Sequence, residues 1–419
     1  MTKKKRLAII STHPIQYNAP WFAMLHKREN CHLTVFYTWP QAIEGFNDPD
    51  FKQKVQWDIP LLDGYNYELV DNISQHPSSK RWSGIDNPTL IKNVKDYTPD
   101  AILIFGWKLK SHFQVMRHFK GKVPIWFRGD STLLDHDIQT ISQLFNSSTH
   151  QLPIVIGINT TKQLLKFKIR QFTLKYVYRH IDKAFYVGTN SKKYFQVHGL
   201  KDHQLVLAPH AIDNHRFTGI DKNEYENKAK QWRKDLGIKP EDKVVLFAGK
   251  LESKKNPLLL LNAIQQLNSQ SLSRSAIQPI KLIFIGSGPL EKKLKHLSQG
   301  DPNIFFIPFV NQSQMPVAYR LGNIFCLPSK GPEETWGLAV NEALASGRPV
   351  LVSDKVGCAV DIVTSGVGRI FKSNTKNELL ACLNELLQSN IQPDTCQNHI
   401  ANWSFEAICQ SMESELSEL

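Results

Sequence analysis

Short apolar runs alternate along this chain with longer, more polar stretches of helical periodicity. Each run is four to six residues long and rich in β-branched and aromatic side chains, as parallel strands buried on both faces are. Strands that alternate with helical stretches predict βαβ units. Five runs lie in the first half and five in the second: Leu7–Ser11, Leu33–Tyr37, Ala101–Phe105, Val123–Phe127, Ala184–Gly188, Val244–Ala248, Lys281–Gly286, Ile304–Ile307, Ile324–Pro328 and Val350–Ser353.

Two sets of strands predict an α/β protein with two Rossmann-like domains. The length of the chain agrees, because 419 residues exceed the usual size of one hydrophobic core. The segment Val206–Phe217 is the best place for the boundary, and a polar helical stretch, Asp221–Leu236, follows it. We therefore expect an N-terminal domain at 1–205 and a C-terminal domain at 206–395. A last helical segment at 396–419 is opened by Asn402–Phe405.

Charge narrows the range of partners. The chain has 51 Lys and Arg against 38 Asp and Glu, a formal net charge of +13. Such a surface favours anionic partners, namely nucleotides, phospholipid surfaces or nucleic acid, although it can also serve solubility alone. We expect no nucleic-acid binding, because the basic residues are not gathered around a recognised binding module.

The apolar runs are all strand-sized, well below the roughly 20 residues of a membrane-spanning helix. The start of the chain is basic, but the apolar run Leu7–Ile10 is too short for a signal peptide. These features predict a cytoplasmic protein. The six cysteines show no Cys-x-x-Cys spacing, so we expect reduced, mostly buried thiols.

One segment combines a loop, a short helix and a strand around two glutamates. Gly-Pro at 331–332 marks a loop, and Gly337 begins a run of helix formers. Gly347 suits the left-handed position past a helix end, and the proline two residues later prevents continuation. Glu334 thus precedes the helix, and Glu342 lies about two turns along, roughly 10 to 12 Å away by helical rise. That spacing suits two separate contacts with one elongated ligand.

This stretch resembles the signature of retaining glycosyltransferases of the GT-B fold, the large family four of group 1 type. The family pattern is Glu, seven residues, Glu, with an aromatic-Gly-Leu after the first glutamate and small residues, Gly and Pro-Val after the second. The matching residues are Glu334, Trp336-Gly337-Leu338, Glu342-Ala-Leu-Ala, Gly347 and Pro349-Val350.

The resemblance implies two Rossmann-like domains that face a cleft, with a C-terminal helix crossing back towards the first domain. It implies transfer of a sugar from a nucleotide-diphosphate donor with retention of configuration. In the family, the residue at Glu334 contacts sugar hydroxyls and the residue at Glu342 binds the ribose. The backbone of Trp336, Gly337 and Leu338, at a helix N-terminus, can also meet phosphate. The acceptor is expected to be a glycan, a lipid-linked glycan or a small molecule, in cell-surface polysaccharide or glycoconjugate synthesis.

Two further loops follow strands in the C-terminal domain, where open α/β sheets bind ligands. Lys250 and Lys255 follow the first strand and can hold a diphosphate as point charges, with Gly249 letting the backbone approach. The family usually has Arg at position 250 and Gly at position 256, where this chain has Lys and Asn256. Gly286 starts a Gly-Ser-Gly turn that either approaches the nucleotide or is a plain tight turn.

The N-terminal domain offers two candidate residues. His13 lies in a His-Pro-Ile-Gln-Tyr loop like that of some bacterial members of the family, where we expect it to face the cleft; a structural turn is the alternative. Related enzymes place a His-Asp pair at another strand end, where this chain has Arg128, Gly129 and Asp130. Asp130 can hold a sugar hydroxyl, while Arg128 can form a salt bridge at the edge of the core.

The segment Lys162–Lys183 is basic and aromatic. It can lie on an anionic membrane as an amphipathic helix, which would make the protein peripheral to the inner face of the cell membrane. Its apolar positions, Leu165, Phe172, Tyr176 and Val177, are equally those of a buried helix face. We favour the buried interpretation.

We expect no metal and no cofactor, with the nucleotide sugar as co-substrate. The Asp-x-Asp triplets at 48–50 and 135–137 do not follow apolar strand runs as a metal-binding triplet would. Two other functions stay open. A GT-B epimerase or hydrolase of nucleotide sugars would need no acceptor, and a non-catalytic relative would bind nucleotide without turnover. The presence of Glu334, Glu342 and Lys255 argues against the second of these.

Overall fold

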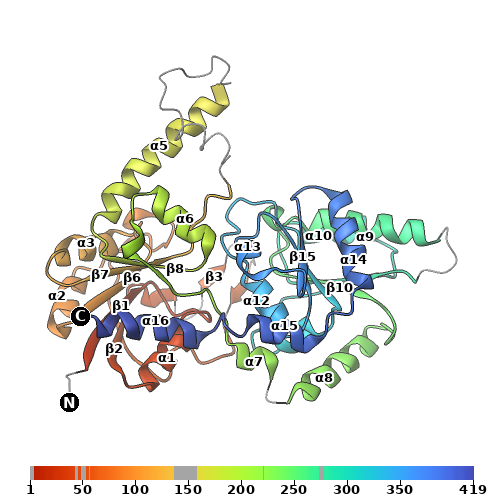
Figure 1. Cartoon of the computed structure of the whole chain (residues 1–419), viewed down its shortest axis with the longest axis horizontal. Helices are drawn as coiled ribbons and strands as arrows, with labels where there is room; N and C mark the ends of the chain where they lie inside the picture. The colour runs from red at the N-terminus through yellow and green to blue at the C-terminus, as the bar shows by residue number, and fades with distance from the viewer. Residues whose placement is uncertain are drawn as a thin grey trace. The chain divides into compact units, whose positions relative to one another are not determined.

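The structure, a computed structural model, describes residues 4–42, 46–48, 53–55, 57–135, 158–219, 221–272 and 278–419. The chain divides into two compact units. The first comprises residues 1–44, 61–209 and 406–419, and the second comprises residues 45–60 and 210–405. Each unit is built around its own parallel sheet with helices packed against it (Figure 1).

The first unit contains a seven-stranded sheet in the order β5-β2-β1-β6-β7-β8-β9, and all of its strand pairs are parallel. The order reverses between β1 and β6, which are adjacent although far apart in sequence. The strands are β1 Lys5–Ser11, β2 Cys31–Tyr37, β5 Asn66–Leu69, β6 Ala101–Phe105, β7 Ile125–Gly129, β8 Lys183–Tyr186 and β9 Leu205–Leu207.

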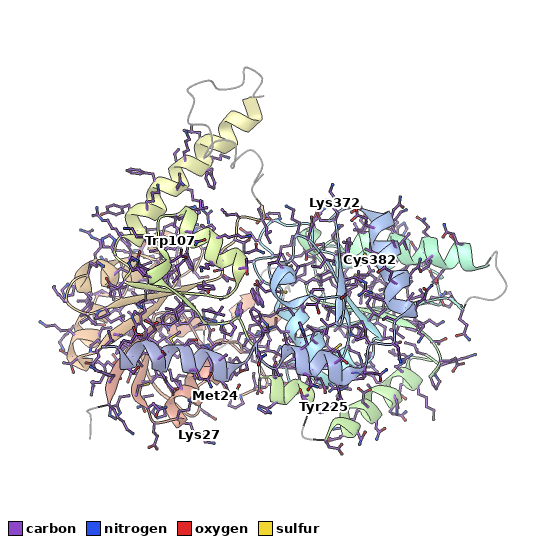
Figure 2. The ribbon with its side chains drawn as sticks, in the orientation of Figure 1. Met24, Lys27, Trp107, Tyr225, Lys372 and Cys382 are labelled. Carbon is purple, nitrogen blue, oxygen red and sulfur yellow. The ribbon has the colours of Figure 1, made fainter. Side chains whose placement is uncertain are left out.

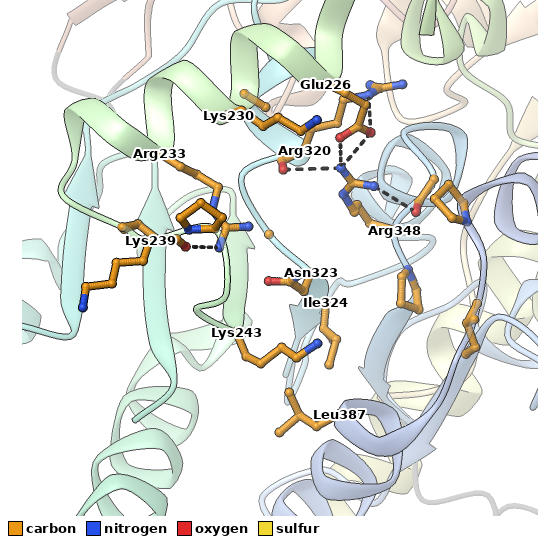
Figure 3. Close-up of a pocket in the computed structure, with 18 of the residues that line it drawn as sticks. Glu226, Lys230, Arg233, Lys239, Lys243, Arg320, Asn323, Ile324, Arg348 and Leu387 are labelled. Carbon is orange, nitrogen blue, oxygen red and sulfur yellow. Dashed lines mark hydrogen bonds and ion pairs between the residues drawn. The ribbon is translucent and has the colours of Figure 1, made fainter. Parts of the chain in front are cut away.

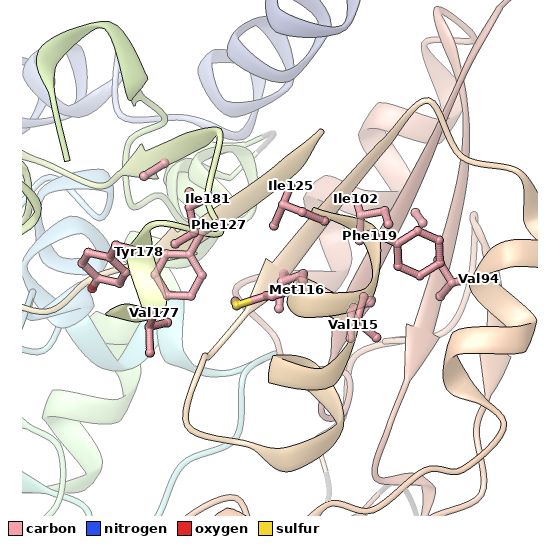
Figure 4. Close-up of a cluster of buried hydrophobic side chains, with 14 of the residues drawn as sticks. Val94, Ile102, Val115, Met116, Phe119, Ile125, Phe127, Val177, Tyr178 and Ile181 are labelled. Carbon is pink, nitrogen blue, oxygen red and sulfur yellow. The ribbon is translucent and has the colours of Figure 1, made fainter. Parts of the chain in front are cut away.

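Helices cover both faces of this sheet. On one face, side chains such as Ile10 and Ile104 join a buried cluster with helices α2, α3, α5 and α6 (Figure 4). Trp107, labelled in Figure 2, packs against that cluster. The alternate residues, such as Ile9, point to the opposite face, where α1 and α16 supply buried side chains. The helices are α1 Ala19–Lys27, α2 Leu90–Tyr97, α3 Lys110–Phe119, α5 Ile158–Tyr178, α6 Thr189–Val197 and α16 Phe405–Ser417.

The second unit contains a six-stranded parallel sheet in the order β12-β11-β10-β13-β14-β15. Its order reverses between β10 and β13. The strands are β10 Val244–Ala248, β11 Lys281–Ile285, β12 Ile304–Ile307, β13 Ile324–Leu327, β14 Val350–Ser353 and β15 Gly368–Phe371. The helices are α7 Asn214–Thr218, α8 Lys222–Asp235, α9 Pro257–Leu272, α10 Glu291–Leu297, α11 Met315–Tyr319, α12 Leu338–Ala345, α13 Ala359–Ile362, α14 Lys376–Gln388 and α15 Pro393–Ile400. A separate antiparallel pair, β3 Phe46–Asp48 and β4 Gln53–Val55, also belongs to this unit.

The C-terminal segment expected at 396–419 contains two helices instead of one. The chain leaves α15 at Ile400 and begins α16 at Phe405. Residues 406–419 then pack within the first unit, where Glu413 accepts from Arg28 Nε at 2.8 Å. Cys409 Sγ also donates to the backbone oxygen of Trp21 at 3.7 Å. The C-terminal helix therefore returns to the first unit, as the family resemblance implied.

All ten predicted strands are present, with small shifts at their ends. The largest shift is at β7, which runs over Ile125–Gly129 instead of Val123–Phe127, because Val123 N–H bonds to Phe119 at the end of α3. The prediction missed the separate pair β3 and β4, and in the two parallel sheets it missed β5, β9 and β15, each only three or four residues long. These last three strands lie at sheet edges and are partly exposed, and their apolar runs are short or interrupted by polar residues.

Candidate functional site

The carboxyl edge of the second sheet brings several predicted residues together. Strands β10 and β13 are neighbours across the point where the strand order reverses. Lys255 ends a short 3-10 helix after β10, and Glu334 lies in the loop after β13. The crevice at such a reversal is the usual ligand site of open α/β sheets. The fold therefore places both charged residues where a ligand is expected.

Lys255 and Glu334 form a close ion pair, with Lys255 Nζ 2.8 Å from Glu334 Oε2. The hydroxyl of Ser329 donates to the same oxygen at 2.9 Å. The Glu334 residue is only 8% exposed, so its carboxylate is held in one orientation. Both bonds use Oε2, and no described residue donates to Oε1. This second oxygen can accept from a ligand hydroxyl.

Two opposing effects act on the Glu334 carboxyl. Burial alone would raise its pKa, because a charge is costly in a low-dielectric environment. The positive charge and hydrogen bond of Lys255, with the Ser329 hydrogen bond and the charge of Lys254, outweigh burial and lower the pKa below its ordinary value. The residue is therefore ionised at neutral pH.

Gly249 and Gly286 bring the turns after β10 and β11 into close contact. A Cβ on Gly286 would lie 2.3 Å from the backbone oxygen of Gly249, and Gly286 has a φ of +121°. A Cβ on Gly249 would lie 3.4 Å from Lys255 Cδ, so the lysine side chain crosses this glycine. The structural alternative for Gly286, a tight turn, thus accounts for the residue without any ligand.

Asn256 occupies a position where the family usually has glycine. Its backbone is left-handed, with φ 54° and ψ 43°, and its side-chain amide donates to Asn374 Oδ1 at 3.2 Å. Asparagine is among the few residues other than glycine that adopt this conformation readily. The substitution therefore keeps the turn that presents Lys255. Lys250 lies in the same loop, partly exposed.

The loop before α12 is shaped by Trp336 and Gly337. The buried Trp336 ring donates through Nε1 to Asn341 Oδ1 at 3.0 Å and packs against Trp403 with ring centroids 5.3 Å apart. Gly337 has a φ of +93° at the N-cap of α12, and no side chain caps this helix end. Leu338 is the first residue of α12. The tryptophan side chain is thus structural, and only the backbone here is suited to meet phosphate.

Glu342 is buried on α12, where Oε2 accepts from the hydroxyl of Tyr319 on α11 at 2.6 Å. The bond joins two neighbouring helices. The helical register that the sequence predicted for Glu342 is present, since α12 runs over Leu338–Ala345. The carboxylate therefore already has a protein partner, and a ligand hydroxyl would have to use its remaining hydrogen-bonding capacity.

His13 and Asp130 lie in the first unit, after β1 and β7. The His13 ring is 3.0 Å from the Thr12 hydroxyl through Nδ1, and it packs nearly perpendicular to the Trp39 ring, with centroids 5.7 Å apart. Burial lowers the pKa of His13 to about 4, so the imidazole is neutral at physiological pH. Asp130 is partly buried at the strand end.

Arg128 has a different role from the salt bridge considered above. Its guanidinium is buried and donates to the backbone oxygens of Ala208 and Pro209, at 2.7 and 2.9 Å. These carbonyls lie just after β9, the edge strand of the sheet. Burial lowers the pKa of Arg128 to about 10, which still leaves it charged at neutral pH. The residue ties the last strand of the first unit to β7.

Three residues of the site were missed by the sequence analysis. Ser329 orients Glu334, and the Ser353 hydroxyl at the end of β14 donates to the backbone oxygen of Ser329. Gly357 donates its N–H to the backbone oxygen of Glu334 at 3.1 Å, and a Cβ there would collide with Thr335. The position of both serines at strand ends is a signal that could have identified them.

The buried interpretation of the basic helix is wrong for three of its four named positions. Leu165, Phe172 and Tyr176 are exposed on α5, and only Val177 is buried. The helix turns Phe167, Leu174 and Tyr178 towards the protein instead. The sequence could not separate these two faces, because both carry apolar side chains at helical spacing.

The two Asp-x-Asp triplets lie in parts of the chain that the structure describes only incompletely. Position 50 of the first Asp-x-Asp triplet and position 137 of the second lie outside the described residues. Within the described residues, no group of three or more His, Cys, Asp or Glu side chains is arranged to hold a metal ion. No helix in that part of the chain has the length and apolarity to cross a bilayer.

Comparison with known proteins finds a family match in the second unit. Residues 228–403 match the family model "Glycosyl transferases group 1". D-inositol 3-phosphate glycosyltransferase of Gordonia bronchialis is 28% identical over 202 residues, which are 44% of this chain and 42% of that enzyme. A sulfoquinovosyl transferase of Arabidopsis thaliana is 32% identical over 124 residues, 30% of this chain and 22% of that protein. The chain thus matches less than half the length of these relatives.

Solved structures resemble the whole chain. HepE of Anabaena, in complex with UDP and glucose, aligns with a TM-score of 0.64 at 15% identity, over 99% of this chain and 100% of that one. Sucrose-phosphate synthase of Thermosynechococcus elongatus aligns with a TM-score of 0.67 at 17% identity, over 99% of both chains. At such identities the likeness shows the fold. The chain has the GT-B fold of two Rossmann-like domains, and residues 228–403 of its second unit, called the group 1 domain below, match the group 1 glycosyltransferase family.

Proposed function

We propose that this protein is a retaining glycosyltransferase that moves a sugar from a nucleotide-diphosphate donor to a glycan, lipid-linked or small-molecule acceptor. The observation that carries the proposal is the Lys255–Glu334 ion pair at the carboxyl edge of the sheet in the group 1 domain. It supplies a cation for phosphate and an ionised carboxylate for hydroxyls within one crevice. Synthesis of a cell-surface polysaccharide or glycoconjugate is the proposed setting.

In this proposal Lys255 and Lys250 bind the donor diphosphate. Departure of the diphosphate from the anomeric carbon concentrates negative charge on its oxygens, and fixed cations stabilise that charge in the transition state. The Lys255 side chain crosses Gly249, which leaves room for the lysine because it has no Cβ. The uncapped start of α12, at Gly337 and Leu338, offers further N–H donors.

Glu334 is proposed to hold hydroxyls of the donor sugar. Its Oε2 is occupied by Lys255 and Ser329, which leaves Oε1 to accept from the sugar. Because the carboxylate is fixed before the donor binds, it orients the anomeric carbon without further loss of side-chain entropy. Glu342 is proposed to bind the ribose while keeping its bond to Tyr319.

Retention is proposed to follow from the leaving phosphate itself accepting the acceptor proton, on the face from which it departs. No enzymic nucleophile is then needed. His13 and Asp130 of the first unit are proposed as catalytic residues, His13 as a neutral imidazole. We propose that neither a metal ion nor a cofactor takes part.

The test is a two-stage measurement on the full chain. Thermal shift with a panel of nucleotide sugars, beginning with UDP-glucose because Anabaena HepE was solved with it, should show a donor-selective rise in Tm. Nuclear magnetic resonance of the product formed with that donor should show the anomeric configuration retained. An inverted product would overturn retention, release of free sugar or of an epimer from donor alone would favour the hydrolase or epimerase, and binding without turnover would favour a non-catalytic protein.

A peripheral membrane role is a separate part of the proposal, carried by α5. Leu165, Ile169, Phe172 and Tyr176 are spaced four, three and four residues apart and are 59%, 58%, 79% and 40% exposed. Residues at this spacing form one stripe along a helix. The α5 sequence contains five Lys or Arg residues and no Asp or Glu. An apolar stripe flanked by positive charge suits the surface of an anionic bilayer.

Sedimentation with vesicles tests this part. We expect the chain to bind vesicles containing about one third phosphatidylglycerol and to leave neutral phosphatidylcholine vesicles unbound, since basic residues near such a surface add about 1 kcal/mol each. Phe172→Ser should weaken binding on the order of tenfold. Val360→Ser removes another exposed apolar side chain, 61% exposed, from the second unit and serves as the control. Unchanged binding of Phe172→Ser, or self-association through α5, would overturn the membrane role.

A further inference from the structure

A second cavity lies at the amino edge of the group 1 sheet, away from the Lys255–Glu334 pair. It has a volume of about 980 Å³. Its lining includes Lys243, Asn323 and Pro349, which come immediately before β10, β13 and β14, and helix α8 covers one side (Figure 3). Because the strands are parallel, these positions lie at the opposite end of the strands from the proposed donor site.

The cavity is strongly positive. One carboxylate lines it, that of Glu226, against seven basic side chains. Figure 3 shows the ammonium groups of Lys230, on α8, and Lys243 turned towards the same space as the guanidinium of Arg348. The basic residues in the lining are Lys230, Arg233, Lys234, Lys239, Lys243, Arg320 and Arg348.

The buried charges are only partly balanced. Arg320 is 2% exposed, and its Nε lies 3.3 Å from Glu226 Oε1. Arg348 donates to both oxygens of the same carboxylate at 2.8 Å. One carboxylate thus serves two guanidinium groups, and buried charges are stable only when paired and hydrogen-bonded. Tyr225, labelled in Figure 2, adds a ring 5.2 Å from the Arg320 guanidinium, which supplies no net charge.

Hydrogen-bond donors are left over as well. The Nε atoms of Arg233 and Arg348 are buried and have no hydrogen-bond partner in the described structure, and the Arg320 Nε has only its ion pair with Glu226. Burial, followed by repulsion from Arg348, lowers the pKa of Arg320 to about 10, and Glu226 only partly offsets this. Asp242 is the other carboxylate that acts on Arg233, but its Oδ2 already accepts from the Lys239 backbone. An anion in the cavity would offset this excess of positive charge.

The lining also contains an apolar wall made of Ile238, Ile324, Leu386, Leu387 and Ile391. The volume is that of a site for a small organic molecule. Both oxygens of Glu226 are engaged by Arg348, so the lining offers no uncommitted carboxylate to act as an acid or base. The combination suits binding and not conversion of an anion that carries an apolar body.

We propose that this cavity binds a small organic phosphate, with its phosphate between α8 and the guanidinium of Arg348 and its body against the apolar wall. The ligand is distinct from the nucleotide-sugar donor. Strand β10 runs from Lys243 at this cavity to Gly249 at the donor site, and β13 runs from Asn323 towards Ser329. A ligand in the cavity would therefore contact the same strands that present the donor-binding loops.

Isothermal titration calorimetry on the full chain tests the proposal. The probes are ATP, fructose 1,6-bisphosphate and inorganic pyrophosphate, with sodium sulfate at equal ionic strength as the reference. We expect at least one of the two organic probes to bind with a stoichiometry near one. The double variant Lys230→Gln and Lys243→Gln should weaken that binding at least tenfold, while its circular dichroism spectrum and Tm stay those of the wild type, since both lysines are exposed.

Lys228→Gln is the matched control, because Lys228 lies on α8 but pairs with Glu224 and does not line the cavity. The same titration with Lys255→Ala distinguishes binding at the amino edge from binding at the donor edge. The affinity of this variant for the organic probe should be unchanged. Binding lost in Lys255→Ala would place the probe at the donor edge and overturn the proposal. So would equal binding of sulfate, unchanged binding in the double variant, or no binding by either organic probe.

Discussion

The two edges of the sheet in the group 1 domain differ in their balance of positive and negative side chains. At the carboxyl edge, Lys255 faces one carboxylate, Glu334, and glycines hold the surrounding turns in contact. At the amino edge, seven basic side chains share one carboxylate around an open cavity. The same strands connect the two edges. A tightly packed pair of opposite charges suits the orientation of a reacting group. A cavity whose positive charges exceed its negative charges suits the binding of an anion.

The strongest test of the carboxyl edge is Glu334→Gln. The amide keeps the shape but loses the charge that pairs with Lys255, so we expect kcat to fall about a thousandfold, on the order of 4 kcal/mol. Steady-state kinetics with the donor found by thermal shift measure this. Glu241→Gln, at an exposed position, is the control. Turnover within twofold of wild type would remove Glu334 from the catalytic site.

Packing at the carboxyl edge is tested by Gly286→Ala. The new Cβ would lie 2.3 Å from Gly249 O, so we expect a loss of roughly 3 kcal/mol in the free energy of unfolding. Gly300→Ala is a matched control, because Gly300 also has a positive φ, +80°, but has open space around its Cβ position. It should cost only about 1 kcal/mol. Equal urea midpoints for the two variants would show that the contact between the turns is not tight.

Lys255→Ala should raise the Kd for the donor about 10- to 100-fold, the loss of one charge-assisted contact. It should also shift the pH dependence. Lys255 lowers the Glu334 pKa against the effect of burial, so its removal raises that pKa and moves the acid limb of the pH–kcat profile to higher pH. Lys230→Ala, at the amino edge, should leave the acid limb unmoved. A shift of equal size in both variants would break the distinction between the edges.

Tyr319→Phe tests whether Glu342 is held by its neighbour. Loss of the 2.6 Å hydrogen bond should cost about 1 to 2 kcal/mol of stability, measured by urea unfolding. If the bond also orients Glu342 for the ribose, the donor KM should rise a few fold while kcat changes little. A stability loss with an unchanged KM would make the Tyr319–Glu342 bond purely structural.

The smallest expected effect is that of chelation. Turnover measured with 5 mM EDTA should equal turnover without it within error, since cationic side chains and backbone donors are proposed to hold the diphosphate. Lys255→Ala assayed with added Mg²⁺ provides the complementary measurement. Restoration of activity by the metal in wild-type protein after chelation would overturn the metal-independent mechanism.

Local pattern was sufficient for much of the fold. The apolar run before Gly249 predicted β10, and the glycine at 347 with the proline at 349 predicted the end of α12, because strand burial and helix termination depend on neighbouring residues. The partner of Glu342 was not predictable, since Tyr319 lies 23 residues away on another helix. The exposed face of α5 was also predicted wrongly, because both of its faces carry apolar side chains.

The sequence by itself determined the two parallel sheets, the order of their strands along the chain, and the residue types at the carboxyl edge, including Lys255 and Glu334. Only the tertiary structure decided that these two side chains meet, that Ser329 joins them, and that Arg233, Arg320 and Arg348 surround a cavity at the opposite edge. The reason is physical. Strand and helix formation follow from nearby side chains, whereas pairing of charges 79 residues apart depends on how the sheet orders its strands.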